Sequence, residues 1–492
     1  MQKFLVAAVL ALSLSLAPAH SAKLPKYEVT PDIQAALDHI SVNSLRGNLS
    51  FLASDLLEGR GTPSRGLDIA AEFIAAQFRR AGLEPAVNGG YFQVADMVVR
   101  RPNLDGFSLE FASKKHSVRI AAEDAHVEVS AAIDLNSAPL FKLVAGDSHE
   151  PRDLDGKVVI LRLRDGRGVR SLLDKAHPAL LVLVGRTSPG AMPAEDLSDP
   201  SEPRKTAPSS RILVFSAQLD DFADSLKAGN NSDATLSAHV AAPVEQHVKV
   251  RNVIGILPGS DPVLKDTYVF LTAHYDHLGT KGPGEGDRIY NGANDDGSGT
   301  VSVIEIANAL ASLKKHPARS IVFMTFFGEE EGLIGSKYYV RHPVFPLAKT
   351  VADVNLEQVG RTDSTKGKQL ARVGPTGYSY SSLMDDFRKA GELTGVNVYD
   401  PGSDTDRFFA ESDNFAFAEA GIPAHSFCVA FMYPDYHAVG DEWQKIDYDN
   451  MAKVDRTFAL GVVMLSDDAA APHWNTDNPR SKGFAHPPAP QP

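Results

Sequence analysis

Two short apolar runs constrain the fold of this chain more than any other feature. They are "YVFLTAH" (268–274) and "SIVFMTFFG" (320–328), each apolar along its length and bounded by turn residues, as strands buried on both faces of a sheet are. The segment between them, 297–315, carries apolar residues at helical spacing, and a further strand and loop follow at 351–360. This alternation predicts an α/β fold with a mostly parallel sheet and helices on both faces.

Residues 118–245 have a different pattern, which predicts a β-rich insert. Short β-rich runs lie at 157–163, 179–185, 211–215 and 234–240, and polar, Pro-rich loops separate them. A short helix is expected at 216–229. Before the insert, 45–83 predicts two helices around a turn. The predicted division is a signal peptide at 1–22, a first part of the main domain at 23–117, the insert at 118–245, the main domain at 246–468 and a disordered tail at 469–492.

Residues 1–22 have the order of a secretory signal peptide. Lys3 is followed by an apolar stretch to about Leu16 and by the small-residue site Ala17–Ala19. The stretch is shorter than the roughly 20 apolar residues of a membrane helix, so we expect export without a membrane anchor. Cys428 is the only cysteine. An exported chain of this size without disulfides is typical of the bacterial periplasm or extracellular space.

Composition excludes some functions. With 492 residues, the chain is long enough for two or three domains, and 43% hydrophobic with 23% charged residues describes a globular chain with ample core. The net charge of −13 argues against binding to nucleic acid, which requires a basic face.

Residue types that bind metals follow each predicted strand of the main domain. They are His274, Asp276 and His277 after the first strand, Asp295 and Asp296 in a Gly-rich loop, the triplet Glu329, Glu330 and Glu331, then Glu357, and His437 in "YPDYHAVGD". Each motif alone is more often a surface pair or a helix cap. Ligands in such sheets bind beyond the carboxyl ends of the strands, so these residues are expected to converge in one crevice. Mixed imidazole and carboxylate ligands suit zinc, or less tightly manganese or cobalt, and two ions would neutralise the crowded carboxylates.

Six motifs together carry a resemblance to a known family: "RNVIGILPGSD", "YVFLTAHYDHLG", "NGANDDGSGT", "FFGEEEGLIGSKYYV", "VNLEQVG" and "YHAVGD". They resemble the co-catalytic zinc aminopeptidase family, which includes secreted bacterial leucyl-type aminopeptidases and the glutamate carboxypeptidase II group. The segment "FLASDLLEGRGTPSRG" resembles the N-terminal signature of the bacterial members. The insert resembles the protease-associated domain that several of them carry. The resemblance covers most of residues 40–465 and implies a phosphorylase/hydrolase-like zinc exopeptidase domain.

The resemblance also implies a metal site with two zinc ions per chain. His274 and Glu357 would each bind one ion, Glu330 and His437 the other, and Asp295 would bridge the two. The family commonly has Asp where this chain has Glu357. Because Glu is one methylene longer, the geometry around the substrate's amine is expected to differ.

Further residues receive roles by the same resemblance. Asp276 would orient the imidazole of His274, and Glu329 would be the general base. Glu331 receives no role and is expected to be a solvated residue before the next helix. The peptide bond between Asp295 and Asp296 is expected to be cis.

The implied activity is exopeptidase cleavage, foremost aminopeptidase cleavage of peptides with a free N-terminus. Segments 404–427 and 428–437 are expected to line the substrate pocket, and the candidate contacts are Arg407, Ser412, Asp413 and Tyr433. His277 and His425 are expected to be structural. Two alternatives stay open: a carboxypeptidase of the same fold, and a single-zinc enzyme like the glutaminyl cyclases.

Overall fold

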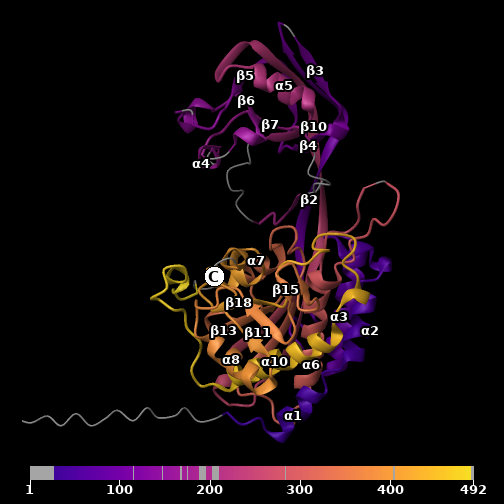
Figure 1. Cartoon of the computed structure of the whole chain (residues 1–492), viewed down its shortest axis with the longest axis vertical. Helices are drawn as coiled ribbons and strands as arrows, with labels where there is room; N and C mark the ends of the chain where they lie inside the picture. The colour runs from indigo at the N-terminus through magenta and orange to yellow at the C-terminus, as the bar shows by residue number, and fades with distance from the viewer. Residues whose placement is uncertain are drawn as a thin grey trace, which may run out of the picture.

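The computed structural model describes residues 27–488 except 115, 147, 167–168, 174, 188–195, 202–209, 283 and 403–404. The predicted signal peptide at 1–22 lies outside the described residues. Figure 1 shows two lobes, which are joined by the long strands β2 (Phe92–Ser113) and β10 (Gly229–Leu257). None of the helices in the described part of the chain combines the length and the apolarity that crossing a membrane requires.

The larger lobe is built on the predicted parallel strands. They are β11 (Tyr268–His274), β12 (Ser320–Phe326), β13 (Thr350–Leu356) and β18 (Ala424–Cys428). These four strands run parallel in the spatial order β12-β11-β13-β18. Strand β10 pairs antiparallel with β12, and β16 (Arg372–Pro375) pairs antiparallel with β18. The expected mostly parallel sheet is confirmed, with antiparallel strands at its flanks.

Helices cover both faces of this sheet, as predicted. Val269 and Leu271 belong to one hydrophobic core, whereas Phe270 between them belongs to another, because successive side chains of a strand point to opposite faces. The first core includes helices α2 (Val42–Leu52), α3 (Arg65–Ala81), α6 (Gly299–Ala311), α8 (Leu383–Thr394) and α10 (Tyr448–Asp467), and the second includes α7 (Ile334–Arg341) and α9 (Asn414–Glu419).

Helix α6 is buried on almost every side because it lies between the sheet and the helices α2, α3 and α10. Its first residue, Gly299, is where the chain approaches the sheet most closely. A Cβ atom there would overlap the Asp296 carboxylate and the Leu356 carbonyl at the end of β13. Glycine therefore lets the helix start directly beside the strand ends that carry the predicted site.

The smaller lobe has hydrophobic cores of its own. Its elements include β5 (Ile133–Lys142), β6 (Val158–Arg162), β7 (Leu180–Gly185), β9 (Arg211–Phe215) and α5 (Ala217–Ser225). Strands β6, β7 and β9 lie where the sequence pattern places them. The run 234–240 is instead part of the long β10, which pairs with β2 from one lobe into the other. The predicted boundaries at 118 and 245 therefore fall inside β3 (Ser117–Ile120) and β10.

The C-terminal segment differs from the disorder predicted for 469–492. Over 469–488 the chain packs on the second core: Trp474 is 6% exposed, and its indole Nε1 donates to the Gly421 carbonyl at 3.0 Å. The Phe484 ring lies 5.5 Å from that of Phe409. The polar, Pro-rich composition suggested no core, but a few apolar side chains are enough to hold the segment on a surface formed by distant parts of the chain.

Replacement of Trp474 tests this packing. We expect Trp474→Ala to lower the free energy of unfolding of the full chain by about 3–5 kcal/mol, because a large buried side chain and its hydrogen bond are lost. Denaturant titration measures the change, and Lys482→Ala, an exposed position in the same segment, serves as the control. A Trp474→Ala protein as stable as the control would show that the segment adds nothing to the fold.

Candidate metal centre

The predicted ligands stand at one edge of the sheet, because the strands that precede them are parallel neighbours. His274 is the last residue of β11, Glu330 lies in the loop after β12, and Glu357 follows β13 directly. Asp295 lies in the turn before α6, and His437 lies in the loop after β18. Five segments far apart in the sequence therefore meet at one place.

Asp295 lies between two histidines. Its Oδ1 is 3.3 Å from the Nε2 of His274, and its Oδ2 is 3.2 Å from the Nε2 of His437. The Nε2 of His274 is also 3.5 Å from Glu357 Oε1, and that of His437 is 3.4 Å from Glu330 Oε2. The five predicted ligands thus form two groups that share one carboxylate.

These distances fit zinc. Two ligand atoms that are each about 2.0–2.1 Å from a tetrahedral zinc ion lie about 3.3–3.4 Å from one another. The four distances of 3.2–3.5 Å agree with this spacing. The Nε2 of His274 and the Oε1 of Glu330 are also buried without a hydrogen-bond partner among the described residues. Buried polar atoms of this kind are normally paired, so a cation bound in each group would supply the partner that these two atoms lack.

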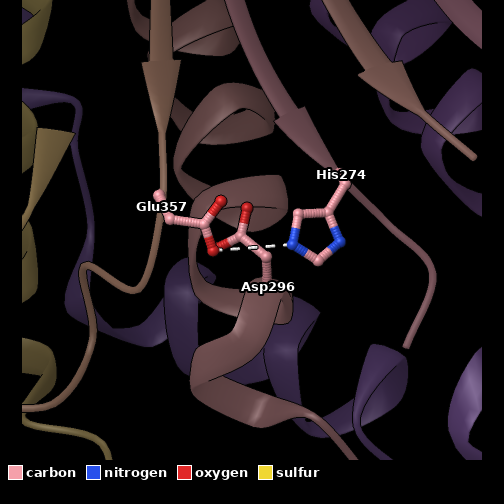
Figure 2. A group of neighbouring side chains, drawn as sticks. All are labelled: His274, Asp296 and Glu357. Atoms are coloured by element: carbon pink, nitrogen blue, oxygen red, sulfur yellow. Dashed lines mark ion pairs between the residues drawn. The ribbon is translucent and has the colours of Figure 1, made fainter. Parts of the chain in front are cut away.

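Two more residues face the same space. Figure 2 shows His274, Asp296 and Glu357, which come from three different elements and point toward one another, and their ligand atoms lie within 4.8 Å of one another. On the other side, the His277 Nδ1 is 2.6 Å from Glu330 Oε1, without the alignment of a hydrogen bond. This distance is too short for two atoms that share a zinc ion, so His277 is a neighbour of Glu330 rather than a fellow ligand.

The carboxylates of the site repel one another. Burial raises the pKa of Glu330 to about 8, and the Asp295 charge adds to the rise. Burial also raises the pKa of Glu329 well above its usual range, against the opposing effect of His274. For Asp295, burial would raise the pKa, but the contacts with His274 and His437 hold it well below its usual range. The side chains together create a strong preference for positive charge.

Asp276 connects the first histidine to the glutamate loop. The His274 Nδ1 lies 3.3 Å from the backbone carbonyl oxygen of Asp276 and 3.5 Å from its Oδ1. The Asp276 Oδ1 accepts the backbone N–H of Glu329 at 3.1 Å, and its Oδ2 accepts that of Glu330 at 3.4 Å. Asp276 thus orients the imidazole and positions the two residues of the triplet that face the cleft. Glu331 lies in the turn before α7 and is partly exposed.

The turn that carries Asp295 is held by residues that sequence reasoning missed. Asp441 Oδ2 accepts the backbone N–H groups of Asn294 at 2.9 Å and Asp295 at 3.1 Å. The Asn294 side-chain oxygen accepts those of Gly360 and Arg361, at 2.9 and 2.7 Å. Asn294 and Asp441 belong to the "NGANDDGSG" and "YHAVGD" motifs, and membership of these motifs is the only sequence feature that could have indicated their supporting role. The Asp295–Asp296 peptide bond is cis, which confirms that expectation.

Arg60 supports the site from behind and was also missed. It belongs to the "EGRGTP" signature and is 1% exposed. Its guanidinium donates to the carbonyls of Tyr275 at 2.7 Å, Asn291 at 2.7 Å and Gly292 at 2.9 Å, and also to that of Leu52. The loops after β11 and before α6 are therefore tied to the N-terminal helices through one side chain.

The four candidate substrate contacts have different positions. Ser412 lines a cleft of about 380 Å³ beside Asp295 and Glu357, and its hydroxyl donates to Glu357 Oε2 at 2.7 Å. Asp413 is fully buried and does not line this cleft. Arg407 lines an adjoining cavity.

Tyr433 does not have the position predicted for a substrate contact. It is 2% exposed, and its hydroxyl donates to Asp441 Oδ2 at 2.9 Å, so it supports the carboxylate that holds the Asp295 turn. His425 is structural, as expected: it is buried, its Nε2 lies 2.7 Å from Ser381 Oγ, and its Nδ1 lies 2.8 Å from the Thr376 carbonyl. The sequence pattern gave no means to tell a buried loop side chain from one that faces the cleft.

Comparison with known proteins shows a family likeness over the part of the chain that carries the site. The profile described as "Peptidase family M28" matches residues 252–462. The chain is 31% identical over 210 residues to "Aminopeptidase YwaD" of Bacillus subtilis (strain 168), which covers 41% of each protein. It is 26% identical over 275 residues to a "Probable zinc metalloprotease" of Pyricularia oryzae, over 54% of this chain and 53% of that protein. The chain thus spans about half or less of the length of these two relatives.

A solved structure shares the fold. The "Aminopeptidase from Aneurinibacillus sp. strain AM-1" matches with a TM-score of 0.60 and 20% identity, over 90% of this chain and 97% of that one. The likeness to peptidase family M28 covers residues 252–462, the part of the chain that carries all five candidate ligands.

Arg60→Lys tests the support behind the site. An ammonium group lacks the planar fork of donors, so several buried carbonyls lose their partner, and we expect a loss of about 2–4 kcal/mol in the free energy of unfolding. The measurement is made with a chelator present, so that bound metal does not contribute to stability. Arg65→Lys, at an exposed position five residues on, is the control and should match the parent protein. Equal stability of the two variants would contradict the supporting role of Arg60.

Proposed function

We propose that the chain is a zinc-dependent exopeptidase that binds two zinc ions and acts as an aminopeptidase on peptides with a free N-terminus. The observation that carries the proposal is Asp295, whose two oxygens face His274 and His437 at distances that suit a shared carboxylate ligand. Manganese or cobalt would be accepted less tightly. A single-zinc enzyme would have no use for the second group of ligands around Glu330.

The residues of the site have different roles in the proposed reaction. Zinc held by these ligands supplies Lewis acidity, which polarises the scissile carbonyl and makes water easier to deprotonate near neutral pH. Glu329 lines the cleft, and its Oε2 is 4.0 Å from His274 Nε2, so its carboxylate can accept the proton of the attacking water and return it to the leaving amine. Asp276 holds the Glu329 backbone and thereby fixes the position of this base.

The cleft favours a positively charged chain end. Besides the proposed ligands, whose charge bound zinc would offset, Glu329 and Glu411 line the cleft and keep their carboxylates available to a substrate. A protonated α-amine is attracted to such a surface, whereas a C-terminal carboxylate is repelled. This charge balance supports the aminopeptidase over the carboxypeptidase alternative.

We further propose that the protein is exported to the bacterial periplasm or the extracellular space and that its smaller lobe is of the protease-associated type. The order of residues 1–22 supports export. The separate hydrophobic core of the smaller lobe supports a distinct domain there. Fusion of residues 1–30 to a periplasmic reporter, followed by fractionation of the cells, tests the location.

Acetylation of the substrate tests end specificity. We expect peptides with a free α-amine to be cleaved and their N-acetyl forms to resist, because the acetyl group removes the charge that the cleft carboxylates attract. Release of the first residue, followed by mass spectrometry, distinguishes the two. Equal cleavage of free and acetylated peptides would favour a carboxypeptidase or an endopeptidase.

The glutamate triplet tests the assignment of base and ligand. Glu329→Gln keeps the shape but cannot accept the proton, so kcat should fall about 100- to 10,000-fold while two zinc ions stay bound. Glu330→Gln removes a charged ligand, so the zinc content should fall together with kcat. Glu331→Gln is the matched control and should change neither. Elemental analysis and kinetics on all three variants decide the roles; loss of zinc from Glu329→Gln, or of activity from Glu331→Gln, would refute them.

A further inference from the structure

A second cavity adjoins the metal-centre cleft. Its volume is about 640 Å³, and Phe408 and Phe431 line both spaces. The two rings stack with centroids 5.5 Å apart and planes at 24°, so they form a shared wall. A peptide bound at the metal centre can therefore reach the second cavity along this pair of rings. We name the second cavity the cationic pocket.

The charge of the cationic pocket is opposite to that of the cleft. Lys366, Arg372 and Arg407 line it, and no aspartate or glutamate is among its described lining residues. The lining of the cleft contains five carboxylates: Asp295, Glu329, Glu330, Glu357 and Glu411. Two zinc ions would offset most of the negative charge of the cleft, whereas the described lining of the pocket contains no carboxylate beside Arg372 and Arg407.

The two arginines are positioned to bind a planar anion. The guanidinium of Arg372 lies over the ring of Tyr399 at 4.1 Å, and that of Arg407 lies over Phe408 at 4.5 Å. An aromatic ring stacked on one face of a guanidinium does not block its N–H donors, because these donors lie in the guanidinium plane and point outward from its edge. Arg372 Nε is buried and has no hydrogen-bond partner among the described residues, and no described carboxylate forms an ion pair with either arginine.

We propose that the cationic pocket binds a carboxylate of the peptide substrate and makes the enzyme selective for short anionic peptides. The carboxylate comes either from an acidic side chain or from the free C-terminus of the peptide. Arg372 and Arg407 form the charged hydrogen bonds. The proposal rests on the proposed peptidase function: the free amine lies toward the carboxylates of the cleft, and the anionic group lies beyond Phe408 and Phe431.

Matched peptide pairs test the selectivity and its source. One pair is Leu-Ala-Ala with a free C-terminus against its C-terminal amide. The others are Glu-Ala-Ala-amide against Gln-Ala-Ala-amide, and Leu-Glu-Ala-amide against Leu-Gln-Ala-amide. In at least one pair we expect the anionic member to have a kcat/KM about 10- to 100-fold higher, mostly through KM, because charged hydrogen bonds of this kind contribute that much. The pair that shows the preference identifies the source of the carboxylate.

The double variant Arg372→Gln/Arg407→Gln assigns the effect to the pocket. It should reduce the preference to within about twofold and leave the neutral peptides within about twofold of the parent protein, because the two residues do not line the metal centre. Arg79→Gln is the matched control: its guanidinium also lies over a tyrosine ring, Tyr91, at 5.2 Å, but far from the pocket in the fold. The control should keep the full preference.

A binding measurement separates this proposal from the proposed function. Calorimetric titration of the metal-free full chain with the same peptides reports affinity without turnover, and the anionic member should bind about tenfold more tightly to the parent than to the double variant. Activity on neutral peptides without any anionic preference would overturn the pocket proposal alone. A preference that survives the double substitution would overturn it as well. Tighter binding of the anionic peptide without turnover of any peptide would support the pocket and refute the peptidase function.

Discussion

Mutual repulsion among buried carboxylates is the constraint on which the rest of this structure depends. Asp295, Glu329, Glu330 and Glu357 stand at one edge of the sheet, and burial keeps water from screening their charges. Backbone hydrogen bonds hold the loops that carry Asp295, Glu329 and Glu330 in place. Asp441 and Asp276 each accept two backbone N–H groups of the loops that carry these residues. The negative field is thus preserved for cations while the loops that create it are held rigidly.

One long strand connects the smaller lobe to the strands that carry the site. Strand β10 pairs with β12, whose end leads into the glutamate triplet, and continues with β2 into the smaller lobe. In addition, the chain between β7 and β9 returns to the larger lobe, where Leu197 joins the first core and Asp199 lies 3.4 Å from Arg341 on α7, the helix that follows the triplet.

Much of the site could be predicted because the relevant rule is local. A buried parallel strand ends at the ligand edge of its sheet, so His274 and Glu357 could be placed from the apolar runs that precede them. The supporting residues could not be placed in this way. Arg60 is more than two hundred positions from the loops whose carbonyls it binds, and nothing in its own segment shows that its guanidinium is buried. The expected substrate contact of Tyr433 could not be judged for the same reason, because the sequence of a loop does not show which way its side chains point.

By itself, the sequence determined the alternation of strands and helices, the order of the central elements and the residue types that meet at the carboxyl edge, because these follow from periodicity and from parallel pairing. Only the tertiary structure decided that Asp441 holds the Asp295 turn, that the segment around Trp474 packs on the second core, and that an arginine-lined pocket opens beside an acidic cleft. These features depend on contacts between segments far apart in the chain. Their free energy comes from burial and pairing in three dimensions, which the pattern along one segment does not contain.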